Sequence, residues 1–312
     1  MIYHNFLLTI LLLLVFTGCK STEHHTAKPT EPLFIKYSVK SYKQTMQILD
    51  SLGYTQENFK KGMEKIPKVL ITHISTRWGR DAKKIPVSTK KSIFLRLMAS
   101  EALIANEEVE KERTKLLSII NKIGHSPITH EESKWLKKCA KKYKVLKSDS
   151  DVLSRERIDQ LIQRVDIVPV SLIVTQGAVE SAWGTSRFAV EGNALFGQWS
   201  FSNKALKPKN QRKYLGNYGL ATFDSPLDSI RSYILNLNTH PAYKEFRKRR
   251  VLLRKTNTPL TGMALVDTLK LYSERGEEYV NDLNRIIKSN HLEWLDFTKP
   301  NDEKPVIIHP ED

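Results

Sequence analysis

Glu180 lies in a short motif whose residue types suit acid catalysis. The motif is Glu180-Ser181-Ala182-Trp183-Gly184, and it ends an apolar run that is typical of a buried helix. At about 100° of rotation per residue, the nearest helix neighbours of Glu180 are Ile173, Gln176, Gly177, Trp183 and Gly184. Burial in such apolar surroundings disfavours the charged form of a carboxyl group and raises its pKa. The sequence therefore predicts a carboxylic acid that holds its proton near neutral pH, as a general acid must.

A structural role is the alternative for Glu180. An ion pair with Arg187 or Arg164 would explain a buried carboxylate without any chemistry. The sequence alone leaves both interpretations open.

Helices are the elements expected to position Glu180. Pro169 stands at the expected first turn of its helix, where proline is favoured. Helical spacing and capping residues predict further helices over about residues 41–53, 90–123, 158–167, 225–238, 261–272 and 277–289. Between residues 197 and 223, aromatic and threonine-containing pieces broken by proline and glycine predict a small β-hairpin lobe. The sequence therefore predicts a mainly α fold with one small hairpin lobe.

Composition divides the chain into five segments. We expect a signal peptide with a lipobox (1–19), a linker (20–36), a helical N-terminal region (37–150), a domain that carries Glu180 (151–298) and a flexible tail (299–312). The linker is polar and contains proline, and three prolines beyond residue 299 indicate a loose tail.

The N-terminus predicts export. Residues 6–16 form an apolar run that is too short to span a bilayer and is typical of a signal peptide. The following Thr17-Gly18-Cys19 resembles a bacterial lipoprotein signal, in which the cysteine receives the lipid. Because Lys20 follows it, we expect a lipoprotein on the periplasmic face of the outer membrane, anchored to the membrane through Cys19. An ordinary cleaved signal or a membrane anchor is the alternative.

The chain is strongly basic, with a formal net charge of +16 over 312 residues. Such a charge favours anionic partners, of which nucleic acid is one. Export argues against nucleic acid and favours the carboxylates of peptidoglycan or anionic lipid, although a general bias towards lysine would give the same charge. If Cys19 carries lipid, Cys139 is the one remaining thiol, which excludes an intramolecular disulfide. We expect Cys139 to be a small buried residue of a helix.

Three motifs in order resemble one family. They are the Glu180 motif, Asn193-Ala194-Leu195-Phe196-Gly197, and Asn238-Thr239-His240-Pro241-Ala242-Tyr243. Together they resemble the Bax-like branch of bacterial proteins, whose mannosyl-glycoprotein endo-β-N-acetylglucosaminidase-like domain is related to glycoside hydrolase family 73. The resemblance covers about residues 155 to 290 and is weaker upstream. It implies a lysozyme-like α+β domain that binds peptidoglycan glycan strands and needs no metal or organic cofactor.

The resemblance also implies roles for individual residues. Glu180 would protonate the glycosidic oxygen of a β-1,4 bond, and Tyr279 would orient the attacking water or the acetamido group of the substrate. The implied substrate-binding residues are Trp183, Asn193, Phe196, Gln198 and Tyr272. Tyr272 competes with Tyr279 for the catalytic role, and core packing is the alternative for both tyrosines, Trp183 and Phe196.

A second catalytic carboxylate is absent from the expected hairpin lobe. Residues 192–223 contain neither Asp nor Glu, although most glycosidases pair two carboxyl groups. Asp224 lies just beyond the lobe and is the candidate base, whereas Asp228 is better explained as the capping-box partner of Ser225.

Three mechanisms therefore remain open. They are inverting attack of water with Asp224 as base, attack by the acetamido group of the substrate, and a lytic transglycosylase reaction in which the 6-hydroxyl of the muramyl sugar attacks. A further alternative is a domain that binds peptidoglycan without cutting it. A buried acid in a complete motif argues against that alternative, because a binding protein has no need of one.

Overall fold

The computed structural model describes residues 33–123, 125–148, 150–200, 202, 205–207 and 218–312. The predicted signal peptide, Cys19 and most of the expected linker lie outside these residues. Within the described part of the chain, no helix combines the length and the apolar character that a membrane span requires.

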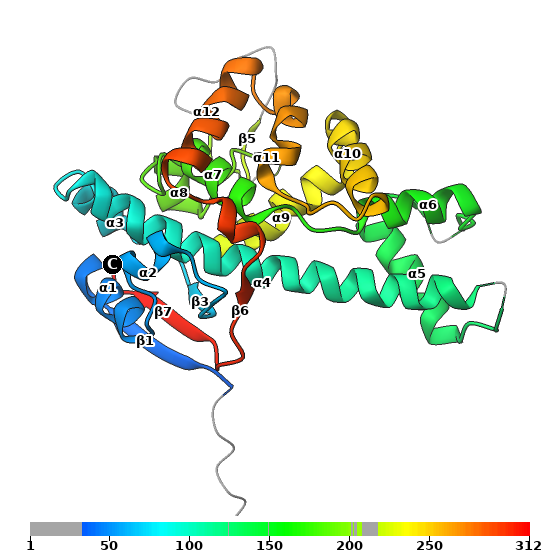
Figure 1. Cartoon of the computed structure of the whole chain (residues 1–312), viewed down its shortest axis with the longest axis horizontal. Helices are drawn as coiled ribbons and strands as arrows, with labels where there is room; N and C mark the ends of the chain where they lie inside the picture. The colour runs from blue at the N-terminus through cyan, green and yellow to red at the C-terminus, as the bar shows by residue number, and fades with distance from the viewer. Residues whose placement is uncertain (1–32, 124, 149, 201, 203–204, 208–217) are drawn as a thin grey trace, which may run out of the picture. The chain divides into compact units, whose positions relative to one another are not determined.

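Helices make up most of the described structure (Figure 1). The α-helices are α1 (Tyr42–Ser51), α2 (Gln56–Lys61), α3 (Thr76–Asp81), α4 (Val87–Lys122), α5 (His130–Lys142), α6 (Arg155–Arg164), α7 (Val170–Glu180), α8 (Arg187–Gly192), α9 (Pro226–Thr239), α10 (Lys244–Lys255), α11 (Gly262–Leu265) and α12 (Glu277–Ser289). The described residues also form the 3₁₀ helices η2 (Pro241–Tyr243), η3 (Val266–Tyr272) and η4 (Glu293–Asp296). The predicted fold class, mainly α and lysozyme-like with a helical N-terminal region, is confirmed.

Capping residues explain where several helices begin. The Ser41 hydroxyl accepts the N–H of Gln44 at the start of α1, and the Ser225 hydroxyl accepts the N–H of Asp228 at the start of α9. Helix α7 begins directly after Pro169, one residue later than the sequence suggests. The helix predicted over residues 261–272 is a short α-helix followed by a 3₁₀ helix.

The C-terminal residues form strands, so the expectation of a loose tail is wrong. Strand β7 (Val306–Pro310) lies between β1 (Ile35–Val39) and β3 (Val69–Ile71) and is parallel to both. A second parallel pair joins β2 (Lys65–Ile66) to β6 (Lys299–Pro300). In Figure 1 the red β7 runs beside the blue β1. Pro300 and Pro310 are the last residues of β6 and β7, and Pro305 directly precedes β7, so none of the three prolines interrupts a strand.

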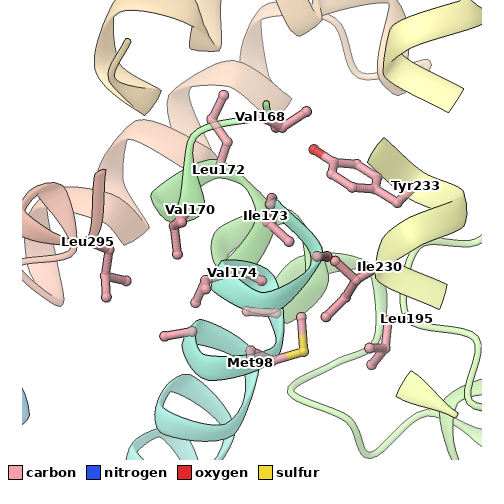
Figure 2. Packing of buried hydrophobic residues seen from close by; sticks show 14 of the residues in the cluster. Met98, Val168, Val170, Leu172, Ile173, Val174, Leu195, Ile230, Tyr233 and Leu295 are labelled. Atoms are coloured by element: carbon pink, nitrogen blue, oxygen red, sulfur yellow. The ribbon is translucent and has the colours of Figure 1, made fainter. Parts of the chain in front are cut away.

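Residues 33–312 form one compact unit, so the boundary expected near residue 150 does not separate two cores. One hydrophobic cluster joins α4 to α7 and to the C-terminal helices. Figure 2 shows Met98 of α4 beside Ile173 and Val174 of α7, with Ile230 and Leu295 from later elements around them. The C-terminal half of α4 packs with α5 and α6 around a smaller hydrophobic cluster. This cluster contains Cys139, which is buried as expected.

The described part of the predicted hairpin lobe contains one short antiparallel pair, β4 (Trp199–Ser200) and β5 (Gly219–Leu220). Leu206 forms an additional bridge to Leu220. Gly219 permits this approach, because a Cβ atom there would lie 2.8 Å from the carbonyl oxygen of Leu206. Residues 208–217 of the lobe lie outside the described residues.

Candidate active site

Glu180 is the last residue of α7, and a strained turn follows it. Ala182, Trp183 and Gly184 have φ values of 51°, 63° and 74°, so three consecutive residues adopt the left-handed conformation. This conformation costs about 1–3 kcal/mol for a residue other than glycine. Ser181 stabilises the turn, because its hydroxyl accepts the N–H of Gly184 at 2.8 Å. The turn therefore sets the direction in which the polypeptide continues directly after the candidate acid.

Trp183 packs against the N-terminal part of the chain. Its ring makes an edge contact with Phe94 of α4 at a centroid distance of 5.8 Å, and the Lys91 ammonium lies 4.8 Å above it. The indole N–H of Trp78 donates to the carbonyl oxygen of Trp183 at 3.3 Å. These contacts correspond to the packing alternative for Trp183 and give no direct support to a sugar-binding wall.

The Glu180 carboxyl group has the environment that the sequence predicts. It is half-buried, and burial raises its pKa above the ordinary value, while the Tyr279 hydroxyl, as a hydrogen-bond donor, and the charge of Arg275 lower it. Burial is the largest of these effects, so the pKa remains raised. A carboxyl group of this kind can deliver a proton at a pH where an exposed glutamate has already lost it.

The two arginines proposed as structural partners of Glu180 are engaged elsewhere. Arg187 forms an ion pair with Glu191 at 2.9 Å. Arg164 donates to the carbonyl oxygen of Tyr143 at 2.8 Å. The described contacts therefore do not include the ion pair that would explain Glu180 as a structural residue.

Four tyrosines surround the Glu180 carboxyl group. Burial raises the pKa of Tyr233, Tyr243, Tyr272 and Tyr279, and the nearby charge of Glu180 raises each of them further. The rings of Tyr272 and Tyr279 stack with their centroids 5.6 Å apart. The structure thus places both tyrosines singled out from the sequence near Glu180, and Tyr279 is the one whose hydroxyl, as a hydrogen-bond donor, lowers the pKa of its carboxyl group.

Sequence reasoning missed the roles of Gln176 and Tyr233. The Tyr233 hydroxyl donates to Gln176 Oε1, and Gln176 Nε2 donates to the Tyr279 hydroxyl oxygen at 2.8 Å. Gln176 and Tyr233 are fully buried. The available signal was Gln176 itself, a polar residue within an apolar run one helical turn before Glu180.

The Phe196–Gly197 segment lies beside Glu180. Gly197 has a φ of 61°, and a Cβ atom there would lie 3.7 Å from Glu180 Oε2. Phe196 is buried and stacks on Tyr233 with a centroid distance of 4.1 Å. Its carbonyl oxygen accepts the Tyr272 hydroxyl at 3.0 Å. Phe196 therefore has the packing role that was its alternative, and it supports the tyrosines around the acid.

Two predicted substrate contacts differ in their surroundings. The Asn193 side chain is buried, accepts the N–H of Ile74 at 2.9 Å and donates to the carbonyl oxygen of Phe223 at 3.0 Å. Its amide therefore joins two distant parts of the backbone and leaves little capacity for a substrate. Gln198 Oε1, in contrast, is buried without a hydrogen-bond partner among the described residues.

The two aspartates near residue 225 occupy different positions. Asp228 exchanges hydrogen bonds with Ser225 and pairs with Arg231 at 2.7 Å, which confirms its capping role. Asp224 is exposed. Among the described residues, the groups that shift the pKa of Glu180 include no carboxylate, Asp224 included.

Comparison with known proteins identifies the class of this site. Residues 155–292 match the family described as mannosyl-glycoprotein endo-beta-N-acetylglucosaminidase. The chain is therefore a glycoside hydrolase-like enzyme that acts on glycan, and Glu180, whose pKa is raised, lies within the matched segment. No solved structure matches the chain.

A curated relative extends the similarity beyond this segment. The chain is 36% identical over 211 residues to Protein bax of Escherichia coli (strain K12), across 67% of this chain and 73% of that protein. The chain belongs to the family of Bax-like proteins that carry a glucosaminidase domain.

Proposed function

We propose that the protein is a peptidoglycan hydrolase of the N-acetylglucosaminidase type that cleaves β-1,4 bonds with Glu180 as its general acid. The observation that carries this proposal is the half-buried Glu180 carboxyl group, whose pKa is raised by burial. Family membership supports a glycan as the substrate. The predicted export and the basic charge support peptidoglycan as the particular glycan.

In the proposed reaction, Glu180 gives its proton to the glycosidic oxygen while the bond to the sugar breaks. The carboxylate that remains accepts a hydrogen bond from Tyr279, which favours the charged form as the proton leaves. Gly197 keeps the space beside Glu180 Oε2 free of a side chain. The leaving oxygen of the sugar would occupy this space.

Two of the three open mechanisms need no second carboxylate of the protein. They use either the acetamido group of the substrate or the 6-hydroxyl of the muramyl sugar, and the surroundings of Glu180 favour both. The third uses water with Asp224 as base, which requires this exposed residue to approach the opposite face of the sugar. Tyr279 would orient the water or the acetamido group.

Mass spectrometry of the products tests the function and separates the mechanisms. The mature protein and its Glu180→Gln variant are incubated with purified peptidoglycan. Reducing N-acetylglucosamine ends support the proposal, and anhydro-muramyl ends indicate a lytic transglycosylase. We expect Glu180→Gln to lower the rate about 10²–10⁴-fold. Wild-type rates from this variant would contradict the role of Glu180, and no products from either protein would favour a binding protein.

We also propose that the protein is exported and anchored through lipid on Cys19. The support is the apolar run over residues 6–16 followed by the lipobox-like Thr17-Gly18-Cys19. An anchor on the periplasmic face of the outer membrane would hold the enzyme next to peptidoglycan.

A further inference from the structure

A chain of three buried side chains ends at the Glu180 carboxyl group. Tyr233 comes from α9, Gln176 from α7 and Tyr279 from α12, so three separate helices contribute one residue each. Their exposed fractions are 0%, 0% and 1%. Water therefore has no access that would let it replace one of these hydrogen bonds.

The donors and acceptors fix the direction in which the hydrogen bonds run from Tyr233 through Gln176 to Tyr279. Tyr233 donates its proton to Gln176 Oε1, which leaves Gln176 Nε2 as the donor to Tyr279 at 2.8 Å. A phenol has one proton, and its oxygen here already accepts the Gln176 N–H. Its own proton is thus left for another acceptor, and Glu180 is the group whose pKa the Tyr279 hydroxyl lowers as a donor.

We propose that Gln176 and Tyr233 are positioning residues that aim the Tyr279 hydroxyl at the Glu180 carboxyl group. The proposal rests on the proposed function and adds two residues to it. Without Gln176 as a donor, Tyr279 could rotate its proton away from the carboxyl group. Without Tyr233, the Gln176 amide loses the partner that fixes which of its two ends meets Tyr279.

The consequence for catalysis concerns the charged form of Glu180. A general acid becomes a carboxylate when its proton leaves, and a donor already aimed at it stabilises that product without reorganisation. The groups that face Glu180 are Tyr233 on α9, Tyr243 on η2, Tyr272 on η3, Arg275 before α12 and Tyr279 on α12. Of these, Tyr279 and Arg275 lower the pKa of Glu180. Of these two groups, Tyr279 is the one that the buried hydrogen bonds of Gln176 and Tyr233 hold in place.

The test compares pH–rate profiles on soluble peptidoglycan fragments for the wild type, Tyr233→Phe, Tyr279→Phe and the double variant. The rate of a reaction that depends on a general acid falls as the pH rises through the pKa of that acid, and this fall forms the basic limb of the pH–rate profile. We expect Tyr233→Phe to raise the pKa of Glu180 and to shift the basic limb to higher pH by about half a pH unit. We also expect kcat to fall about tenfold with KM nearly unchanged.

The double variant separates positioning from a structural effect. If Tyr233 acts through Tyr279, the Tyr233→Phe substitution shifts the basic limb in an otherwise wild-type protein and has no further effect when Tyr279 is already phenylalanine. A limb that does not move, or that moves equally in both backgrounds, overturns the proposal. Tyr54→Phe is the matched control, because Tyr54 is also fully buried and its hydroxyl makes a hydrogen bond at 3.0 Å to the Arg96 carbonyl. It should leave the limb in place.

A second variant and a second measurement keep the result unambiguous. Gln176→Met has nearly the same volume and lacks both the amide oxygen and the amide NH₂ group, so it tests the hydrogen-bonded chain independently if Tyr233→Phe does not fold. A ¹³C NMR titration of the Glu180 carboxyl carbon follows its pKa without any substrate. If Glu180→Gln retains wild-type activity, the proposed function fails, whereas an unchanged NMR titration in Tyr233→Phe and Gln176→Met overturns the positioning role itself.

Discussion

Replacing Glu101 by glutamine should change how the stability of the protein depends on pH. Glu101 lies on α4 with an exposed fraction of 1%, beside a mainly apolar cavity of about 100 Å³, and its Oε1 accepts the N–H of Ile71 at 2.9 Å. Burial raises its pKa from 4.5 to about 8, opposed by the Ile71 N–H and the charge of Arg231, while Asp228 raises it further. The folded protein therefore keeps a proton that the unfolded chain releases.

The size of the effect follows from these two pKa values. A group whose pKa is raised on folding contributes its full stability below the unfolded value of 4.5 and loses it as the pH rises through about 8. Each pH unit in this window costs about 1.4 kcal/mol, and less close to either pKa, so wild-type protein should lose about 3.5 kcal/mol between pH 5 and pH 8 from Glu101. Glu101→Gln keeps the acceptor for Ile71 but cannot ionise. Its stability relative to the wild type should therefore rise by about 3.5 kcal/mol over the same interval.

Urea denaturation at the two pH values measures this difference. Glu57→Gln is the control, because the hydrogen bond and the charge of Lys61 lower the pKa of this exposed carboxylate below its usual value. Glu57 is thus ionised throughout the interval and its replacement should not alter the slope. The same stability difference between wild type and Glu101→Gln at both pH values would refute the reasoning.

Three further predictions concern other parts of the chain. Gly197→Ala and Gly53→Ala both place alanine at a positive φ, 61° and 69°, and should each lose about 1 kcal/mol in denaturation. Only Gly197→Ala adds a Cβ near Glu180, so it alone should lower the hydrolysis rate; equal rates would contradict this. Deleting residues 306–312 removes the central strand and should abolish cooperative thermal unfolding, followed by circular dichroism. Cys19→Ala should shift the exported protein from the membrane to the soluble fraction, and continued membrane association would argue against lipidation.

Local signals in the sequence predicted several of the helices, although α2, α3, α8 and α10 were not expected. The helix expected over residues 277–289 has these bounds in α12, and α9 begins after its predicted cap, Ser225. Glu180 was also predictable, because its apolar helix neighbours alone indicate a raised pKa. These features depend on residues within one or two helical turns of each other.

The features that were not predictable depend on contacts between distant residues. Strand β7 pairs with β1 across most of the chain, and no local pattern names that partner. Tyr233 meets Gln176 across 57 residues, and a buried tyrosine in a helix looks like any core residue until its partner is known. The packing of Phe196 and Trp183 likewise depends on neighbours from other elements.

The strained turn after Glu180 connects these distant contacts to the chemistry. A left-handed Ala182–Trp183 pair costs free energy, so other interactions must hold it in place. Trp78 and Phe94 supply them by contacting Trp183, and both precede the segment over residues 155–292 that matches the family. The site therefore includes more of the chain than the glucosaminidase domain. A fragment limited to that domain would keep Glu180 but lose the contacts that fix the turn behind it.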